Sequence, residues 1–415
     1  MIKEYNLLFI GGGAASLFGA ALFLSKWLDS NPKQQPPKVA ILEKMERCGR
    51  KVGITGKGRC NLTNTKEWSQ FSTHIHPNSN FFRGAFYSMN NIKTIEFFNR
   101  IGLETVVERG DRVYPKSMKA LSVVGALERA ILDRGGEIVT RCNVIEIDRD
   151  GNHFIVKDSN NNLYKTEYLL IATGGYSYPS TGSTGDGYLF ASKFGHKIER
   201  CFPSLTALIP SDYNSSFYGI SLKNVSLSLV INGSVIQEEF GDLDFTNGGI
   251  EGPIGFKISR NGVYNLINRQ KVEILLDLKP AVSLEQLKNR IDREFSNIES
   301  RDFNLLLRKL MPAQLISPFL KQNKTLNIDS LPYMLKNWRF NIKDFVGYER
   351  AVVTAGGVSL KEVNKKSMES KLVSNLFFIG ELLDLDADTG GFNLQIAFST
   401  AALAVDYIFR QISLK

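Results

Sequence analysis

The sequence lacks several features that would place it in other classes of protein. No apolar run reaches the roughly 18 residues needed to cross a bilayer. The first five residues do not have the layout of a signal peptide, because the apolar segment after them is broken by glycines. The four cysteines, Cys48, Cys60, Cys142 and Cys201, form no C-x-x-C pair, so neither a zinc site nor a redox-active dithiol is expected. These absences predict a cytoplasmic protein without a metal site.

The positive charges are not gathered into tracts. The formal net charge of +9 permits attraction to nucleic acid or acidic ligands, but the scattered basic residues favour an ordinary solvated surface. No internal repeat and no second G-x-G-x-x-G loop is found, which argues against a separate NAD(P) domain. A length of 415 residues predicts two or three domains.

A glycine turn near the N-terminus is the strongest motif. Residues 6–10 are a short apolar run typical of a strand buried on both faces of a parallel sheet. Gly11 to Gly13 follow, and an apolar helical pattern then runs from about residue 14 to 28. Such a turn brings bare backbone and a helix N-terminus to a pyrophosphate. Ser16 stands where the fingerprint has its third glycine, and a small residue there preserves close packing.

A carboxylate ends the second predicted strand. Residues 39–42 are apolar and lead to Glu43, the position from which a dinucleotide site binds the adenosine ribose hydroxyls. The Pro-rich linker at 29–37 explains why Glu43 lies farther along than usual. Residues 47–65 then interleave glycines with basic side chains, as anion binding requires; the alternative is a floppy basic loop.

Extended and helical patterns follow one another through the rest of the chain. Helices are predicted at 92–101 and 119–134, and strands at 137–140, 144–148, 153–157 and 164–167, interpreted as a meander laid across the main sheet. Another buried strand, 168–172, leads to Thr173-Gly174. We expect residues 1–202 and 345–415 to form one α/β domain. Residues 203–344 would be an insert, with a β-rich part at about 203–280 and a small helical part at about 281–344.

A second strand-to-helix turn near the C-terminus fits a tightly held flavin. A strand at 376–379 ends in Gly380-Glu381, and Gly390-Gly391 opens a helix at 393–409. The Glu381 and Asp384 carboxylates can accept hydrogen bonds from ribitol hydroxyls. The helix N-terminus can stabilise negative charge at the flavin N1–C2 edge. An unrelated C-terminal helix with a glycine cap is the alternative.

Five blocks carry a family resemblance: GGGAASL, GRKVGITGKGRCNLTN, ATGGYSYPSTGSTGDGY, VTAGGVSLKEV with SMESK, and GELLDLDADTGGFNLQIAFST. In order and spacing the chain resembles bacterial BaiN/YhiN-type flavoproteins, also described as aminoacetone-oxidase-like, from residue 6 to about 409. The resemblance implies an α/β fold: a GR2-type Rossmann domain holding non-covalent FAD, interrupted by a β-rich domain and a small helical subdomain.

The resemblance also implies the cofactor-binding residues. Position by position they are Gly11, Gly13, Ala14, Ala15, Glu43, Lys44, Arg50, Lys51, Gly58, Arg59, Cys60, Asn61, Val144, Thr173, Gly174, Gly380, Glu381, Asp384, Gly391, Asn393, Leu394 and Gln395. The chain departs from the family pattern at Ser16, at Tyr176 and at Asn247, which stands where histidine is common. Because a histidine could have been an acid–base group, the catalytic residues stay unassigned.

The leading hypothesis is an FAD-dependent oxidoreductase that exchanges hydride between a small organic substrate and flavin N5, with O2 or diffusible NAD(P)H completing the cycle. One alternative is a flavoprotein that acts on RNA, which the charge permits without favouring. Another is a sensor that holds FAD without turnover. No membrane partner is expected, and the sequence does not indicate an oligomeric state. Cys60 beside Arg59 suggests a reactive thiol, but a packing role is the favoured interpretation.

Overall fold

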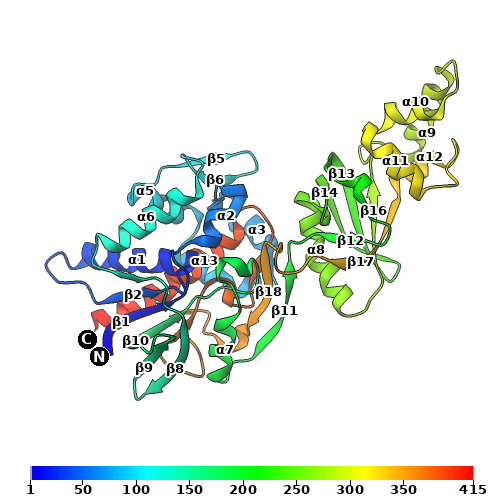
Figure 1. Cartoon of the computed structure of the whole chain (residues 1–415). Coiled ribbons are helices and arrows are strands. Elements are labelled where there is room, and N and C mark those ends of the chain that lie inside the picture. Colours follow the sequence, from blue (N-terminus) through cyan, green and yellow to red (C-terminus); the bar gives the residue numbers. More distant parts are fainter. Residues whose placement is uncertain (1, 415) are drawn as a thin grey trace. The chain divides into compact units, whose positions relative to one another are not determined.

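The structure is a computed structural model that describes residues 2–414 (Figure 1). It divides into two compact units. The first contains residues 1–201 and 353–415, and the second contains Phe202–Val352. The chain therefore leaves the first unit once and returns to it once, as domain insertion requires.

A seven-stranded sheet forms the centre of the first unit, in the order β7-β2-β1-β10-β9-β8 with β19 also paired to β10. Its middle strand β1 runs parallel to both neighbours, with Leu8 beside Ala40 on one side and Leu169 on the other. Residues 7–10 of β1 are all buried, because a parallel sheet is covered on both faces. The bounds are β1 Ile2–Ile10, β2 Val39–Leu42, β7 Glu137–Val139, β8 Val144–Asp150, β9 His153–Asp158, β10 Leu163–Ile171 and β19 Leu376–Phe378. The predicted α/β class is confirmed.

The predicted meander is present but is placed differently. Strands expected at 164–167 and 168–172 are one continuous strand, β10. Along one edge β10 pairs parallel with β1 over its whole length. Along the other edge its first half pairs antiparallel with β9, and its last three residues pair parallel with β19. The meander therefore extends the main sheet instead of crossing it. A sequence pattern could not show this, because one strand changes partners halfway along.

Two long helices pack together against this sheet. The helices α1 (Ala14–Ser30) and α13 (Phe392–Ser413) are in contact, and the rings of Phe18 and Phe398 stack with centroids 4.7 Å apart. A Cβ on Gly19 would lie 3.3 Å from that of Ala401, so this glycine permits the close approach. By length and composition α13 could cross a membrane, but two thirds of its apolar window is buried in the unit, as in a core helix.

The first unit contains many further short elements, and the last of these strands before the insert, β11, continues into the second unit. The further elements are α2 Arg50–Gly58, β3 Thr63–Asn64, α3 Trp68–Phe71, η1 Ser72–His74, β4 Ile75–His76, α4 Ser79–Ser88, α5 Asn91–Arg100, β5 Thr105–Glu108, β6 Arg112–Pro115, α6 Ala120–Leu132, η2 Pro179–Thr181, α7 Asp186–Lys193, β11 Ile198–Ser204, β18 Val353–Val358, η4 Leu360–Glu362, η5 Gly380–Leu382 and β20 Asp386–Ala387.

The second unit is a closed six-stranded barrel with a helical extension. Its strand order is β12-β15-β14-β13-β16-β17. The hairpin between β13 and β14 turns at Asn232-Gly233, both with positive φ, as that dipeptide predicts. The bounds are β12 Leu208–Pro210, η3 Ser215–Phe217, β13 Ile220–Ile231, β14 Ser234–Thr246, β15 Gly249–Glu251, α8 Gly252–Ile267, β16 Val272–Asp277, α9 Leu284–Ser296, α10 Phe303–Leu310, α11 Ala313–Gln322, α12 Leu331–Lys336 and β17 Trp338–Phe345.

Two details of the insert differ from expectation. The helical part ends at α12, because the alternating residues 338–345 form β17 and close the barrel against β12 and β16. Residues 345–352 belong to the second unit, where the Val346 and Val352 N–H groups donate to the Ala207 and Leu205 carbonyls.

Candidate cofactor and active site

The glycine turn presents backbone where no side chain could fit. Gly11 has φ +94°, and a Cβ there would lie 2.9 Å from the Ala172 carbonyl oxygen and from the Thr173 Cα. A side chain is excluded at Gly12 as well, because a Cβ there would come within 2.3 Å of the Cys48 sulfur. Gly13 is the N-cap of α1. The N–H groups of the first turn, which includes Ala14 and Ala15, have no partner within the helix, so they can bind an anion.

Glu43 is fixed beside this turn. Its Oε2 accepts a hydrogen bond from the Gly12 N–H at 2.6 Å, and its Oε1 accepts from the Met45 N–H at 2.7 Å. The carboxylate is nearly buried, and each oxygen keeps a further lone pair for a hydroxyl. The adjacent Lys44 is turned toward α7, where its ammonium lies 2.6 Å from the Asp186 carboxylate. Lys44 thus ties two segments together.

The basic glycine-rich segment is partly helical. It contains α2, whose residues 55–57 depart from helical geometry. Arg50 pairs with Glu46 and donates to the Ser180 carbonyl at 3.0 Å. Gly58 has φ +83°, and a Cβ there would meet nothing within 4 Å. The Arg59 guanidinium lies over the Tyr114 ring at 4.7 Å. The basic side chains in these contacts are held in place, which argues against a floppy loop.

Two buried oxygens after this segment lack partners. Asn61 Oδ1 and Thr63 Oγ1 are buried and accept no hydrogen bond from any group in residues 2–414. Buried polar atoms are almost always paired, so unpaired ones indicate a missing ligand or water. Cys60, in the same segment, is fully buried. Burial raises the pKa of its thiol to about 12, although a hydrogen bond with Thr55 acts in the opposite direction.

The second glycine turn is joined to the first part of the site by Glu381. Its Oε2 lies 2.6 Å from Lys51 Nζ, and its Oε1 accepts from the Ser177 hydroxyl at 2.7 Å and the Thr354 N–H at 2.9 Å. The preceding Gly380 donates its N–H to the Thr400 hydroxyl at 3.0 Å. This network brings together three distant segments of the chain.

The N-terminus of α13 is held against β3. Gly391, its N-cap, has φ +95°, and a Cβ there would lie 2.5 Å from the Thr63 carbonyl group. Asn393 clamps the preceding turn through its side-chain amide, which bonds both the N–H and the carbonyl of Ala387. Leu394 is partly buried in the same first turn. The side chain of Gln395 turns into the core instead, where its amide donates to the Met89 carbonyl.

The other predicted residues lie at the same edge or close to it. Thr173 and Gly174 follow β10, and Gly11 touches Thr173. Val144 begins β8, and the Cys142 N–H just before it donates to the Glu43 carbonyl at 2.9 Å. Asp384 is half-buried, and its N–H donates to the Val358 carbonyl at 3.1 Å.

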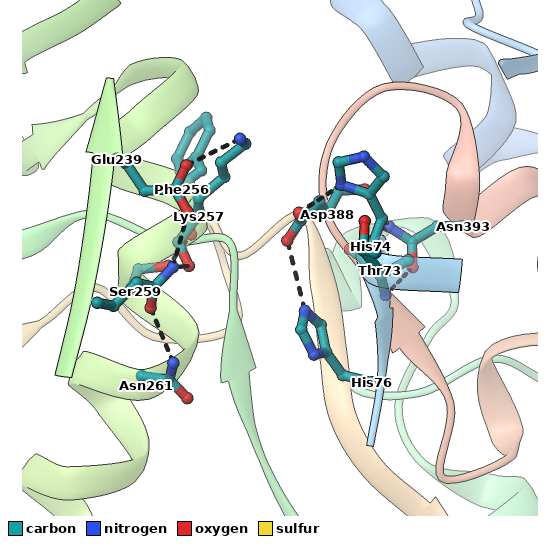
Figure 2. Close-up of polar contacts among 12 residues, drawn as sticks. Thr73, His74, His76, Glu239, Phe256, Lys257, Ser259, Asn261, Asp388 and Asn393 are labelled. Atoms are coloured by element: carbon teal, nitrogen blue, oxygen red, sulfur yellow. Dashed lines mark hydrogen bonds and ion pairs between the residues drawn. The ribbon is translucent and has the colours of Figure 1, made fainter. Parts of the chain in front are cut away.

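A titratable cluster at this site escaped the sequence analysis. Figure 2 shows Asp388 between two histidines, with His74 Nδ1 at 2.8 Å and His76 Nε2 at 3.5 Å. The His74 ring stacks on Phe392, with centroids 4.2 Å apart, at the start of α13. Burial alone would raise the pKa of Asp388, but hydrogen bonds and charge from the two histidines lower it to about 2. The signal available was the H-x-H spacing, which has no meaning until β4 pairs with β20.

The second unit carries its own polar cluster, also drawn in Figure 2. Lys257 of α8 lies 2.9 Å from the Glu239 carboxylate of β14. Asn261, one turn farther along α8, donates to the Gln237 side chain at 2.8 Å. These contacts attach α8 to the barrel. Asn247, where the family resemblance led us to expect histidine, accepts a hydrogen bond from Arg350 at 2.9 Å.

Comparison with known proteins identifies the family. Residues 5–407 match the model of the HI0933-like protein Rossmann domain. The chain belongs to this family. A relative of the HI0933-like chain is a 3-dehydro-bile acid delta(4,6)-reductase of Clostridium scindens, 28% identical over 95% of this chain and 97% of the relative. Another is a ribosomal RNA dihydrouridine synthase of Haemophilus influenzae, 29% identical over 97% of this chain and 98% of the relative. The expected family is thereby confirmed.

A solved structure supports the fold. The 3-ketosteroid delta1-dehydrogenase of Sterolibacterium denitrificans, in complex with 1,4-androstadiene-3,17-dione, is 11% identical with a TM-score of 0.54, covering 99% of this chain and all of that one. Within the HI0933-like chain, the residues fit an adenine dinucleotide: two helix N-termini without obstructing side chains, a fixed carboxylate at the end of β2, and unpaired buried oxygens between them.

Proposed function

We propose that this chain is an FAD-dependent reductase that saturates a carbon–carbon double bond conjugated to a carbonyl group. The observation that carries the proposal is the pair of glycine turns, at Gly11 and Gly391, that open α1 and α13 within one unit. The first suits the pyrophosphate, with Glu43 beside it for the adenosine ribose. The second suits the pyrimidine edge of the flavin: the first-turn N–H groups of α13 would bind the ring, and Asp384 would bind the ribitol. The Gln395 amide is buried and would not take part.

The names of two relatives suggest the reaction. One is called a delta(4,6)-reductase and the other a dihydrouridine synthase. Dihydrouridine is uridine with its 5,6 double bond saturated, so both names describe reduction of a double bond. Such a bond accepts a hydride at one carbon and a proton at its neighbour. FAD, when bound, supplies the hydride-transfer chemistry, and the chain must bind the substrate and provide the proton.

His74 is our candidate for the proton donor. Its Nδ1 lies 2.8 Å from the Asp388 carboxylate, and this contact orients the imidazole ring. Stacking on Phe392 fixes the ring beside the start of α13, and its side chain keeps 20% exposure, so a substrate can reach it. His76 shares the same carboxylate and is the alternative donor.

The reductant is proposed to be diffusible NAD(P)H, because only one G-x-G-x-x-S turn occurs in the sequence and no second dinucleotide loop accompanies it. O2 would serve if the physiological direction is oxidation. A cytoplasmic location and a small organic substrate remain predictions.

Purified protein tests this proposal directly. It should be yellow and release FAD on denaturation. Anaerobically, NADH or NADPH should bleach the band near ~450 nm, and an enone should restore it. His74→Asn should slow the restoring step at least tenfold while FAD content stays unchanged. The matched control is His153→Asn, in β9 of the sheet. A colourless protein that binds no added FAD would contradict the cofactor assignment.

An RNA substrate is the second candidate. Two relatives, from Haemophilus influenzae and Escherichia coli, are named ribosomal RNA dihydrouridine synthase, at 29% and 28% identity. The discriminating measurement is reoxidation of the reduced flavin by a small enone compared with uridine-containing RNA. A protein that binds FAD but whose flavin is neither reduced nor reoxidised by any of these compounds would instead favour the sensor hypothesis.

A further inference from the structure

A hollow lined by lysines lies in the first unit, away from the two glycine turns in the sequence. Its volume is about 450 Å³. It is lined by η4, by the turn that follows η4 and by the start of α4. Its polar lining consists of Lys361, Lys365, Lys366, Lys371, Asn364 and Asn78. All but Asn78 belong to the VSLKEV and SMESK blocks and the residues that join them. Those blocks contribute to the family resemblance, yet the cofactor site uses none of these residues.

The lysines are presented by a fixed turn. Residues 363 and 370 pair as an antiparallel bridge, which closes a short loop. Within the loop, Asn364 Oδ1 accepts from the Lys366 N–H at 3.0 Å, and its carbonyl accepts from the Met368 N–H at 2.7 Å. The Met368 side chain is completely buried and anchors the loop. Lys365 and Lys366 thus project from a defined backbone.

The lysines of the hollow have no direct carboxylate partner among the residues described, although the charge of Lys361 is one cause of the lowered pKa of Glu199. Within residues 2–414, none of the four lysine ammonium groups forms an ion pair with a carboxylate, whereas Lys26, Lys44 and Lys51 elsewhere in this unit each do. Lys371 is instead held by the Lys361 carbonyl, to which it donates at 2.7 Å.

The carboxylates nearest in sequence are occupied elsewhere. Glu362 accepts from the Lys197 N–H at 2.8 Å, and Glu369 accepts from the Asn375 N–H at 2.8 Å. Four like charges around one hollow repel each other, and a bound polyanion would remove that repulsion.

We propose that this lysine hollow binds the phosphate groups of a nucleotide ligand. Ammonium groups are strong point-charge partners for phosphate, and the two asparagine side chains add neutral donors. The volume lies within the range of small-molecule sites, roughly 300–1,000 Å³. The same chemistry is offered by the phosphates of a free dinucleotide such as NADPH and by the backbone of RNA. The proposal depends on the charge of the hollow and does not require the reductase reaction.

The test compares two double variants of the full-length, FAD-loaded protein. Lys365→Gln/Lys366→Gln removes two charges from the hollow. Lys33→Gln/Lys38→Gln removes two charges from exposed positions in the linker before β2, so net charge is matched. Lys371 is left intact because it holds backbone. FAD content and the thermal unfolding midpoint should equal those of the parent in both. Binding is measured for NADPH, inorganic pyrophosphate and a labelled 12-nucleotide RNA, each at 50 and 200 mM salt.

The hollow variant should weaken at least one of these probes tenfold or more, while the linker variant changes each less than twofold. If the hollow binds the phosphates of RNA, the slope of log affinity against log salt should be smaller in magnitude by about 1 to 2 in the hollow variant. A loss confined to NADPH identifies the dinucleotide, and a loss shared with pyrophosphate identifies a general phosphate site. Equal affinities of the two double variants for all three probes would overturn the proposal. The reductase proposal fails separately, through absent flavin bleaching.

Discussion

Lys51 Nζ lies 2.6 Å from Glu381 Oε2, joining α2 to η5 across 330 positions of sequence. Both side chains are about one-fifth exposed, so the pair is screened less than a surface pair. Glu381 also accepts from Ser177 and Thr354. One carboxylate therefore orders the segments that follow β2, β10 and β19, at the edge of the sheet where the cofactor is expected.

We expect Glu381→Ala to lower the free energy of unfolding by about 2 to 3 kcal/mol, because it removes the carboxylate partner of the Lys51 ammonium and the acceptor of the Thr354 N–H. Urea denaturation of the FAD-free protein measures this loss. The control is Glu104→Ala, which breaks the exposed pair with Lys116 and should change stability very little. Similar losses in both variants would show that the Glu381 network is not a structural centre.

Glu43→Ala should weaken FAD binding without preventing folding. Its carboxylate meets the glycine turn by accepting a hydrogen bond from the Gly12 N–H. Losing charge-assisted hydrogen bonds to the ribose costs roughly 1.5 to 3 kcal/mol, which corresponds to about a 10- to 150-fold rise in the dissociation constant. Titration of the apoprotein with FAD, followed by flavin fluorescence, measures this dissociation constant. Glu46→Ala serves as the control, and unchanged FAD affinity in Glu43→Ala would mean that another carboxylate binds the ribose.

Asp388 predicts an acid-dependent stability. Its pKa is depressed from 3.8 to about 2 in the folded chain, so folding is favoured by the ionised form. The stabilisation is present above pH 4 and is lost as the pH falls from about 4 to 2; its size is roughly 2 kcal/mol. The difference in unfolding free energy between the parent and Asp388→Asn should therefore shrink over that interval. A difference that stays constant between pH 5 and pH 2 would contradict the assigned His74–Asp388 interaction.

Cys60 should prove unreactive in the native protein. Burial raises the pKa of its thiol to about 12, and the side chain has no exposed surface. Iodoacetamide at pH 8 should alkylate Cys60 orders of magnitude more slowly in native protein than in urea, as followed by peptide mass spectrometry. Cys60→Ser should retain FAD and most of the rate of flavin reduction. Loss of that rate by several orders of magnitude, with flavin fully bound, would make the thiol catalytic.

Local patterns in the sequence were sufficient to predict several turns and strand ends that the structure contains. Buried strands ending in glycine produced the turns at Gly11 and Gly380, and the position of Glu43 follows from the length of β2. The α/β class and the interruption by a β-rich insert followed from the same periodicities. These features are readable because strand, turn and helix signals lie within a few residues of each other.

Only the tertiary structure could decide which distant residues meet. The Lys51–Glu381 pair, the His74–Asp388 pair and the inward turn of Gln395 each depend on contacts between elements far apart in sequence. The change of partners along β10 and the closure of the barrel by β17 are likewise non-local pairings. A sequence specifies which faces are apolar, but which faces meet is settled by packing over the whole chain, and that packing set the candidate proton donor and the lysine hollow in place.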